Sequence, residues 1–245
     1  MSKTTVFSIP FDDVSLEEAV ERAVAMSEER RSAIAVTPNA EILLAARRDA
    51  RLRQILQRAD LTVADGIGVI LASRLLGQPL THRVPGIDLA AAVMAKLAGK
   101  GESVYLLGAE NGVGEQAAER LQMRYPGLRI AGVCGGYFNI NEEETLRREI
   151  NAACPALLLV CLGSPRQEKW LDENVGKLHF GLGIGLGGAL DVFSGYKRRA
   201  PVIVQRVGLE WLYRLICEPR RIGRIARLPL LFLAAAKIRL GGNQA

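Results

Sequence analysis

Short runs of apolar and β-branched residues recur along the chain, and most are separated by stretches whose apolar positions repeat with a helical period. The runs that predict strands are Thr5–Ile9, Ala33–Val36, Leu61–Ala64, Val104–Leu107, Leu128–Val133, Leu157–Leu162 and Phe180–Ile184. Ser15 and Glu18 have the spacing of a capping box and predict a helix over the apolar positions from Leu16 to Val24. Further helices are expected at Ala40–Arg58, Gly68–Leu76, Asp88–Leu97, Gly114–Arg124, Glu142–Ala152 and Gln167–Val175. Alternating strands and helices indicate an α/β fold, a Rossmann-like body with a mostly parallel sheet and flanking helices.

Polar residues and glycines follow the ends of the predicted strands. In chain order they include Thr37, Asn39, Asp65, Gly108, Gly136, Tyr137, Gln167, Gly187 and Asp191. In open parallel sheets, ligands bind beyond the carboxyl ends of the strands. Each of these residues alone also fits an ordinary turn or helix cap, but together they favour a ligand site at one edge of the sheet.

The composition is that of a folded protein and offers little to hold a metal. Apolar residues make up 49% and charged residues 24% of the chain, which excludes disorder, collagen and coiled coil as descriptions of the whole. The four cysteines form no C-x-x-C pair and the chain has two histidines, so no zinc or iron–sulfur site is expected. No D-x-D pair with the spacing for a divalent ion occurs either. We therefore expect neither a metal nor a cofactor.

Two familiar phosphate-binding motifs are absent. Gly108, Gly112 and Gly114 follow a predicted strand and open a predicted helix, but their spacing is not that of G-x-G-x-x-G. No G-x-x-x-x-G-K-[ST] motif occurs. If phosphates bind here, backbone N–H groups, helix N-termini and arginines must neutralise them.

The net charge of the chain changes from negative to positive near residue 196. Residues 196–245 carry 11 Lys and Arg against two Glu, a net charge of +9, whereas the other residues sum to −3. Such a tail is expected to meet a membrane, a nucleic acid or a phosphorylated ligand, unless it is simply a solvated basic face. Its basic residues alternate with bulky apolar ones such as Trp211 and Leu231, which favours an amphipathic membrane-surface helix over a nucleic-acid arm. We expect an α/β body over 1–195 and a basic helical appendage over 196–245.

The chain is expected to be cytosolic and to meet the membrane only from its surface. The segment Met1–Leu16 contains Asp12 and Asp13 and lacks the apolar stretch of a signal peptide. The longest apolar run near the C-terminus, Leu228–Ala236, is far shorter than the ~20 residues that span a bilayer.

A set of motifs, found in one order along nearly the whole chain, is highly specific. They are Thr37-Pro38-Asn39-Ala40-Glu41, Ala64-Asp65-Gly66, Arg83-Val84-Pro85-Gly86 with Asp88, Gly163-Ser164-Pro165-Arg166-Gln167-Glu168, Gly187-Gly188-Ala189-Leu190-Asp191-Val192, Lys197-Arg198-Arg199-Ala200-Pro201 and Gly208-Leu209-Glu210-Trp211-Leu212-Tyr213-Arg214-Leu215. This set resembles the WecG/TagA/CpsF family of bacterial glycosyltransferases. It is most similar to the TagA branch, the N-acetylmannosaminyltransferases of wall teichoic acid synthesis.

The resemblance implies a reaction and its partners. UDP-N-acetylmannosamine would donate its sugar, with inversion, to the 4-hydroxyl of N-acetylglucosamine on undecaprenyl diphosphate, at the cytoplasmic face of the membrane. Such a transfer needs a base to remove the acceptor proton, and Asp65 is the candidate; its alternative role is to cap the helix after Gly66. Thr37, Asn39 and Gln167 would bind the donor, and Arg83 would clamp the diphosphate, although turns, a helix start and a surface ion pair would also explain them.

The resemblance assigns the remaining candidates to the uridine of the donor and to the lipid diphosphate of the acceptor. Gly108, Gly136, Tyr137, Gly187 and Asp191 are expected at the uridine end. Arg214, Arg221 and Arg224 would hold the lipid diphosphate, or else attract headgroups without specificity.

Other functions remain open from the sequence alone. The donor could be UDP-N-acetylmannosaminuronate, as in the enterobacterial branch of the family. The chain could also be a non-catalytic, membrane-recruited nucleotide-binding module, or a nucleic-acid-binding protein that uses its basic tail. No nucleic-acid-binding signature occurs outside the tail, so no nucleic-acid partner is expected, and a homo-oligomer is left open.

Overall fold

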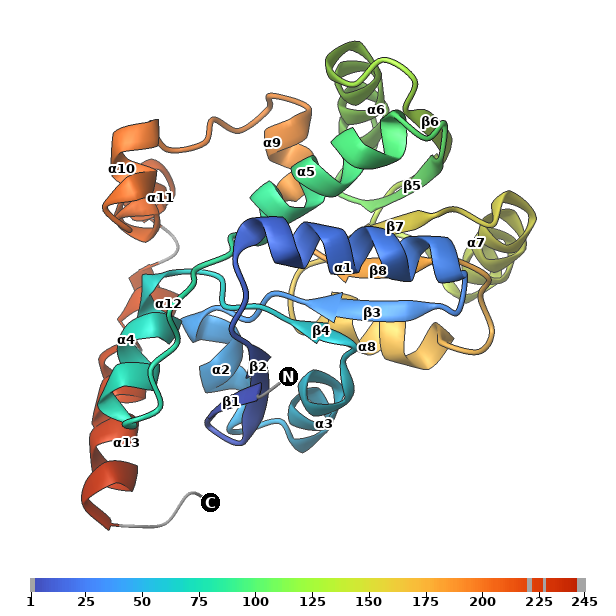
Figure 1. The fold of residues 1–245 in the computed structure, drawn as a ribbon. Coiled ribbons are helices and arrows are strands. Elements are labelled where there is room, and N and C mark those ends of the chain that lie inside the picture. Colours follow the sequence, from blue (N-terminus) through green and yellow to red (C-terminus); the bar gives the residue numbers. More distant parts are fainter. Residues whose placement is uncertain (1–2, 220–221, 227, 242–245) are drawn as a thin grey trace.

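Among the residues that the computed structural model describes (3–219, 222–226 and 228–241), six parallel strands form one sheet in the order β4-β3-β8-β7-β5-β6 (Figure 1). The strands are β3 Ala33–Val36, β4 Leu61–Thr62, β5 Ser103–Gly108, β6 Arg129–Cys134, β7 Leu157–Cys161 and β8 Leu182–Gly185. Strands that are covered on both faces carry continuous apolar residues, and every residue of β7 is buried. The predicted α/β fold with a mostly parallel sheet is confirmed.

Helices cover both faces of the sheet (Figure 1). One face packs against α1 (Leu16–Glu29), α5 (Gly86–Ala98), α6 (Val113–Arg124) and α9 (Ala189–Phe193). The other packs against α2 (Ala40–Ala46), α3 (Ala50–Arg58), α4 (Ile67–Leu75), α7 (Ile140–Ala153), α8 (Arg166–Asn174) and α13 (Leu228–Gly241). Since α6 leaves β5 toward one face and α8 leaves β7 toward the other, the loops after these neighbouring strands diverge. Such a divergence is where open α/β sheets bind ligands.

Most predicted elements are found to within about two residues at either end. The capping box at the start of α1 is also confirmed. Ser15 Oγ accepts the backbone N–H of Glu18 at 3.2 Å, and the Glu18 carboxylate accepts that of Ser15 at 2.8 Å. The two bonds satisfy donors that the first turn of a helix otherwise leaves unpaired.

The strand predicted over Thr5–Ile9 is wrong. Two short antiparallel strands, β1 (Lys3–Val6) and β2 (Ile9–Asp12), occupy this region instead. The chain reverses at Phe7 and Ser8, whose φ angles of 50° and 62° lie in the left-handed region. Glycine or asparagine usually marks such a turn, and neither is present here, so the sequence carries no signal for it.

The single helix predicted over Ala40–Arg58 is also wrong, because two helices occupy it. α2 ends at Ala46 and α3 begins at Ala50. The carboxylate of Asp49 accepts the backbone N–H of Leu52 at 3.0 Å and so caps the second helix. Capping by Asp favours a helix start at this point over a continuous helix.

The C-terminal segment adds α10 (Val202–Arg206), α11 (Glu210–Cys217) and α12 (Ile222–Ile225) before α13. α13 lies alongside α4 and also contacts α2 (Figure 1). Its side chains Leu231 and Ala235 are fully buried, in the same apolar cluster as Val6 of the first strand. The last described helix therefore completes the core on that face of the sheet. The division of the chain at residue 196 stays a prediction.

Within the described ranges, no helix combines the length and the apolar character that crossing a bilayer requires.

Candidate functional site

Asp65 lies where the loops after β3 and β4 meet the start of α5. Its backbone N–H donates to the carbonyl of Pro38 at 3.1 Å. Its carboxylate accepts the backbone N–H of Gly86, the first residue of α5, at 3.3 Å. The residue that caps α4 is Gly66, without a side-chain bond, so the alternative in which Asp65 caps α4 is wrong. The carboxylate is held at the N-terminus of α5 instead, where the helix dipole is positive.

Gly86 brings Thr37 and the loop after β8 close to this carboxylate. A Cβ at Gly86 would stand 2.6 Å from Thr37 Oγ1 and would overlap Leu186. Only glycine permits this approach. Thr37 is buried, with 7% of its surface exposed, and lies beside the helix end that binds Asp65.

Asn39 and Arg83 have clear structural contacts in the same region. The side-chain oxygen of Asn39 accepts the backbone N–H of Ile42 at 3.0 Å and caps α2. Arg83 Nη2 donates to the carbonyl of Gln205 at 2.9 Å and so joins the loop before α5 to α10. This bond uses one of the five N–H donors of a guanidinium. A role for either residue toward substrate stays a prediction.

Gln167 is buried and joins α8 to the loop after β8. Its Nε2 donates to Glu168 Oε1 at 2.9 Å, and its Oε1 accepts the backbone N–H of Gly187 at 2.7 Å. Both ends of the amide therefore contact protein and fix the Gly187 turn. Glu168 is 3% exposed, and this burial raises the pKa of its carboxyl above the ordinary value.

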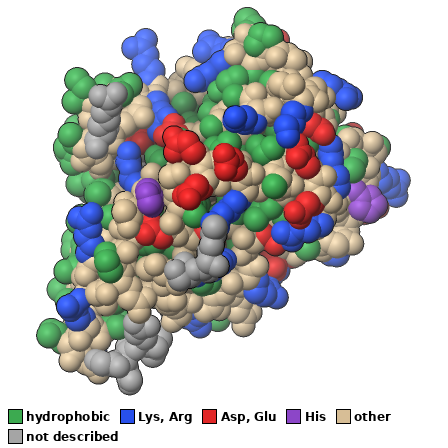
Figure 2. Space-filling model, in the orientation of Figure 1, with side chains coloured by type: hydrophobic (Ala, Val, Ile, Leu, Met, Phe, Trp, Pro, Cys, Tyr) green, Lys and Arg blue, Asp and Glu red, His purple; other side chains and the backbone are tan. Residues whose placement is uncertain are grey.

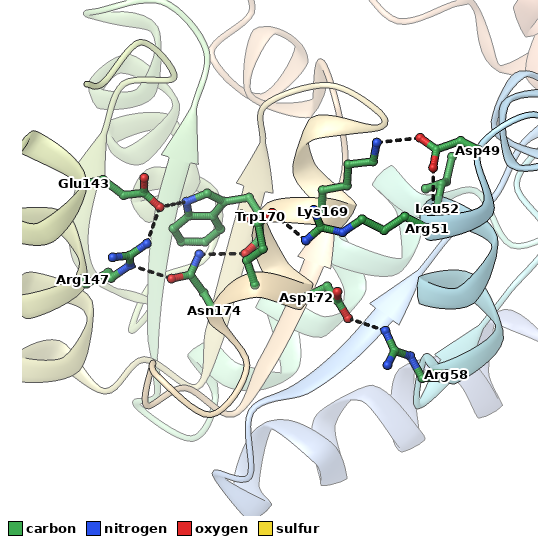
Figure 3. Close-up of polar contacts among 11 residues, drawn as sticks. Asp49, Arg51, Leu52, Arg58, Glu143, Arg147, Lys169, Trp170, Asp172 and Asn174 are labelled. Atoms are coloured by element: carbon green, nitrogen blue, oxygen red, sulfur yellow. Dashed lines mark hydrogen bonds and ion pairs between the residues drawn. The ribbon is translucent and has the colours of Figure 1, made fainter. Parts of the chain in front are cut away.

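α8 is anchored to neighbouring helices on both of its flanks (Figure 3). α7 contacts one side and the α3 region contacts the other, each through hydrogen bonds or ion pairs between side chains. The contacts are Trp170 Nε1 to Glu143 Oε1 at 3.0 Å, Arg147 Nε to Asn174 Oδ1 at 2.7 Å, Lys169 Nζ to Asp49 Oδ2 at 2.6 Å and Arg58 Nη2 to Asp172 Oδ1 at 3.0 Å. The N-terminus of α8, which carries Gln167, is thereby fixed relative to the sheet.

The loops after β5, β6 and β7 meet at a second part of the site. Gly108 approaches the backbone of Cys161 so closely that a Cβ would overlap it. Gly136 donates its N–H to Ala109 at 2.8 Å and accepts from Arg166 Nη1 at 2.9 Å. The Arg166 guanidinium also lies over the ring of Phe138, 5.2 Å from its centre.

Tyr137, between Gly136 and Phe138, is 77% exposed and presents a phenol ring to solvent at this point. Tyr137 leaves an aromatic ring exposed in the same loop that Arg166 bonds at Gly136, a combination that suits a planar, anionic ligand such as a nucleotide. Arg166 belongs to the motif at residues 163–168, but its sequence position alone does not reveal that it contacts the loop after β6.

Two basic residues just after α9 pair with acids on both sides. Lys197 lies 3.0 Å from Asp191 and 3.3 Å from Glu218. Arg199 pairs with Asp88 of α5, and its Nε lies 3.6 Å from Glu210 of α11.

Hydrogen bonds to Asp88 raise the pKa of Arg199 above its ordinary value; burial opposes this, and the charges of Glu210 and Asp65 add to it. In the sequence, Arg199 belongs by charge to the basic segment 196–245, and no local pattern indicates these partners.

Two of the three arginines predicted to hold the lipid diphosphate lie in the C-terminal helices. Arg214 is in α11 and Arg224 in α12, and Arg221 lies outside the described residues. Among the residues that the structure describes, no group of three or more His, Cys, Asp or Glu side chains is placed to hold a metal ion.

The site therefore has two parts joined by the Gln167–Gly187 bond. Thr37, Asp65 and Gly86 form one part, and the loops of Gly108, Gly136 and Tyr137 form the other. The arrangement offers a carboxylate at a helix N-terminus and, apart from it, a loop that carries an exposed aromatic ring and is bonded by an arginine. It can accept a proton at one place and hold an anion at another.

Comparison with known proteins shows the family of the chain. Residues 4–245 match the model of the glycosyl transferase WecG/TagA/CpsF family. Two curated relatives, from Staphylococcus aureus strains MRSA252 and NCTC 8325, are each 34% identical over 238 residues, which is 96% of this chain and 93% of the relative. Both are named N-acetylglucosaminyldiphosphoundecaprenol N-acetyl-beta-D-mannosaminyltransferase. The chain belongs to the WecG/TagA/CpsF family of glycosyltransferases.

Proposed function

We propose that this glycosyltransferase moves N-acetylmannosamine from UDP-N-acetylmannosamine, with inversion, to the 4-hydroxyl of N-acetylglucosamine on undecaprenyl diphosphate. The observation that carries the proposal is the Asp65 carboxylate at the N-terminus of α5. The relatives of this chain are named as transferases of N-acetylmannosamine to N-acetylglucosaminyldiphosphoundecaprenol. The reaction would take place at the inner face of the cell membrane, with the protein bound peripherally.

The chemistry needs one base and a means to stabilise the leaving group. The acceptor oxygen forms a bond to the anomeric carbon while the bond from that carbon to UDP breaks. Asp65 takes the proton of the acceptor hydroxyl as the sugar gains oxocarbenium character. Thr37 lies beside the same helix end and would hydrogen-bond the transferred sugar.

The second part of the site suits the nucleotide. Tyr137 can stack on the uracil ring, and glycine turns at Gly108, Gly136 and Gly187 let the backbone approach it. Asp191 would accept hydrogen bonds from the ribose. Arg83 and helix N-termini would offset the charge of the departing diphosphate, so the proposal requires no metal.

The C-terminal helices offer a surface for the membrane (Figure 2). Figure 2 shows apolar side chains along the edge of the molecule that these helices form, with Lys and Arg among them. Exposed apolar side chains there are Val202, Ile203, Trp211, Ile216, Ile222 and Leu233. A surface that mixes apolar and basic residues binds the headgroup boundary of an anionic leaflet. Arg214, Arg221 and Arg224 would then meet the lipid diphosphate.

Turnover tests the proposed reaction directly. A panel of UDP-sugars is offered with a short-chain, diphosphate-linked N-acetylglucosamine, and products are measured by mass spectrometry. UDP release is expected only with the acceptor, and fastest with UDP-N-acetylmannosamine. A faster reaction with the uronate would assign the other donor, and UDP binding without turnover would favour a non-catalytic module.

Ile216→Asp is expected to weaken binding to vesicles with anionic lipid by about tenfold or more, because burying an isoleucine contributes roughly 1.5–3 kcal/mol. Ile216 is 70% exposed on α11. The measurement is co-sedimentation at two salt concentrations, and binding should also weaken as salt screens the basic residues.

Met123→Asp is the matched control, because Met123 is 73% exposed but lies on α6, in the body. Vesicle binding of this variant should stay at the wild-type level. Equal losses in the two variants would contradict a membrane surface on the C-terminal helices.

A further inference from the structure

Arg199 is held in one orientation by two helices that are far apart in the sequence. Its two terminal nitrogens bind the two carboxylate oxygens of Asp88, with 2.8 Å between Nη2 and Oδ2. Its Nε is buried without a hydrogen bond and lies 3.6 Å from Glu210 Oε1. Only 20% of the side chain is exposed. This geometry holds the guanidinium in place and uses both terminal nitrogens on Asp88.

Asp88 and Asp65 approach the same turn of α5. Gly86, the first residue of the helix, donates its N–H to the Asp65 carboxylate, and Asp88 follows two positions later. Two negative charges near one helix end repel each other. Ion pairing to a guanidinium removes this repulsion.

Arg199 stands in the field of three carboxylates that come from different elements. Asp65 comes from the loop after β4, Asp88 from α5 and Glu210 from the start of α11. The attraction between Arg199 and Asp65 is mutual. The positive charge of Arg199 therefore acts on Asp65 as well, although its direct contacts are to Asp88.

We infer that Arg199 is a positioning residue for Asp65: it neutralises Asp88 at the start of α5, so that Asp65 remains ionised and bonded to Gly86 as the proton acceptor. The inference rests on the proposed function, which makes Asp65 the base. It also separates Arg199 from the other basic residues of the C-terminal segment, since its charge serves the site and is not available to a membrane.

Carbon-13 NMR of the Asp65 carboxyl, assigned by its loss in Asp65→Asn, tests the inference without any need for turnover. In Arg199→Gln, Asp65 is expected to titrate at a pH about one unit higher than in the wild type, as for the loss of a nearby opposite charge. Arg199→Lys, which keeps the charge, should titrate close to the wild type. An unchanged Asp65 titration in Arg199→Gln overturns the inference.

The pH profile of kcat supplies a second readout. The acid limb of Arg199→Gln should move to higher pH by a similar amount, with about tenfold lower kcat below that limb. KM for the donor should stay within about twofold. If the wild type shows no turnover with any donor, the proposed function fails while the NMR titration still decides the role of Arg199.

Two further variants guard against an effect of misfolding. Asp88→Asn combined with Arg199→Gln removes both charges of the Arg199–Asp88 pair, and Asp65 should titrate there between the wild type and Arg199→Gln. Arg30→Gln is the matched control, since Arg30 is a half-buried arginine paired with Glu102 away from the site. It should leave the Asp65 titration unchanged. A shift in Arg30→Gln equal to that in Arg199→Gln overturns the inference.

Discussion

Asp65→Asn is expected to lower kcat by about 10²-fold or more and to leave the melting temperature nearly unchanged. Asparagine has the same shape and an oxygen that can still accept the Gly86 N–H, which Asp65 accepts at 3.3 Å. It cannot take a proton at neutral pH, and loss of a general base costs roughly 10²–10⁴-fold. The rate is measured with the short-chain acceptor at saturating donor, and unfolding by circular dichroism.

Asp172→Asn provides the control for removing a carboxylate. Asp172 pairs with Arg58 between α8 and α3, on a flank of α8 (Figure 3). Exposed pairs contribute about 0–1 kcal/mol, so both rate and stability should stay close to the wild type. If Asp65→Asn keeps more than a third of the wild-type rate, another residue is the base.

Leu231→Ala is expected to lower the free energy of unfolding by about 2–5 kcal/mol, the cost of deleting buried methyl groups and leaving a cavity. Leu231 is fully buried in the cluster where α13 packs against α2 and α4. Urea denaturation followed by tryptophan fluorescence measures the change as a shift in midpoint at constant slope.

Leu233→Ala, two positions along the same helix, should behave in the opposite way. Leu233 is 66% exposed, so the free energy of unfolding should change by no more than about 0.5 kcal/mol. Vesicle binding should weaken instead, because the side chain lies on the apolar surface of the C-terminal helices. Equal losses of stability in the two variants would show that α13 does not pack through Leu231.

The sheet could be predicted from the sequence because burial on both faces leaves a strong pattern. β7, with five apolar residues in a row, admits few other interpretations. The hairpin at Phe7 could not be predicted, since its turn has none of the residues that favour positive φ. The break between α2 and α3 depends on one Asp49 hydrogen bond, and the residues around it are otherwise compatible with one helix.

The candidate site could be predicted only as a set of positions. Residues that follow parallel strands must share one edge, so Thr37 and Asp65 could be placed together without a structure. The partners of each side chain depend on contacts between distant segments. Arg83 bonds a carbonyl 122 positions away, and Arg199 bonds an acid 111 positions away. No local pattern encodes such pairs.

The position of α13 constrains how the chain can mature on the ribosome. Leu231 and Ala235 are synthesised after every strand of the sheet, yet they fill the same cluster as Val6. Folding during synthesis proceeds from the N-terminus, so the apolar side chains of α2 and α4 that pack against α13 stay uncovered until Leu231 and Ala235 emerge. The nascent chain therefore carries an open apolar face for most of its elongation, and a chaperone that binds such faces has its longest opportunity there.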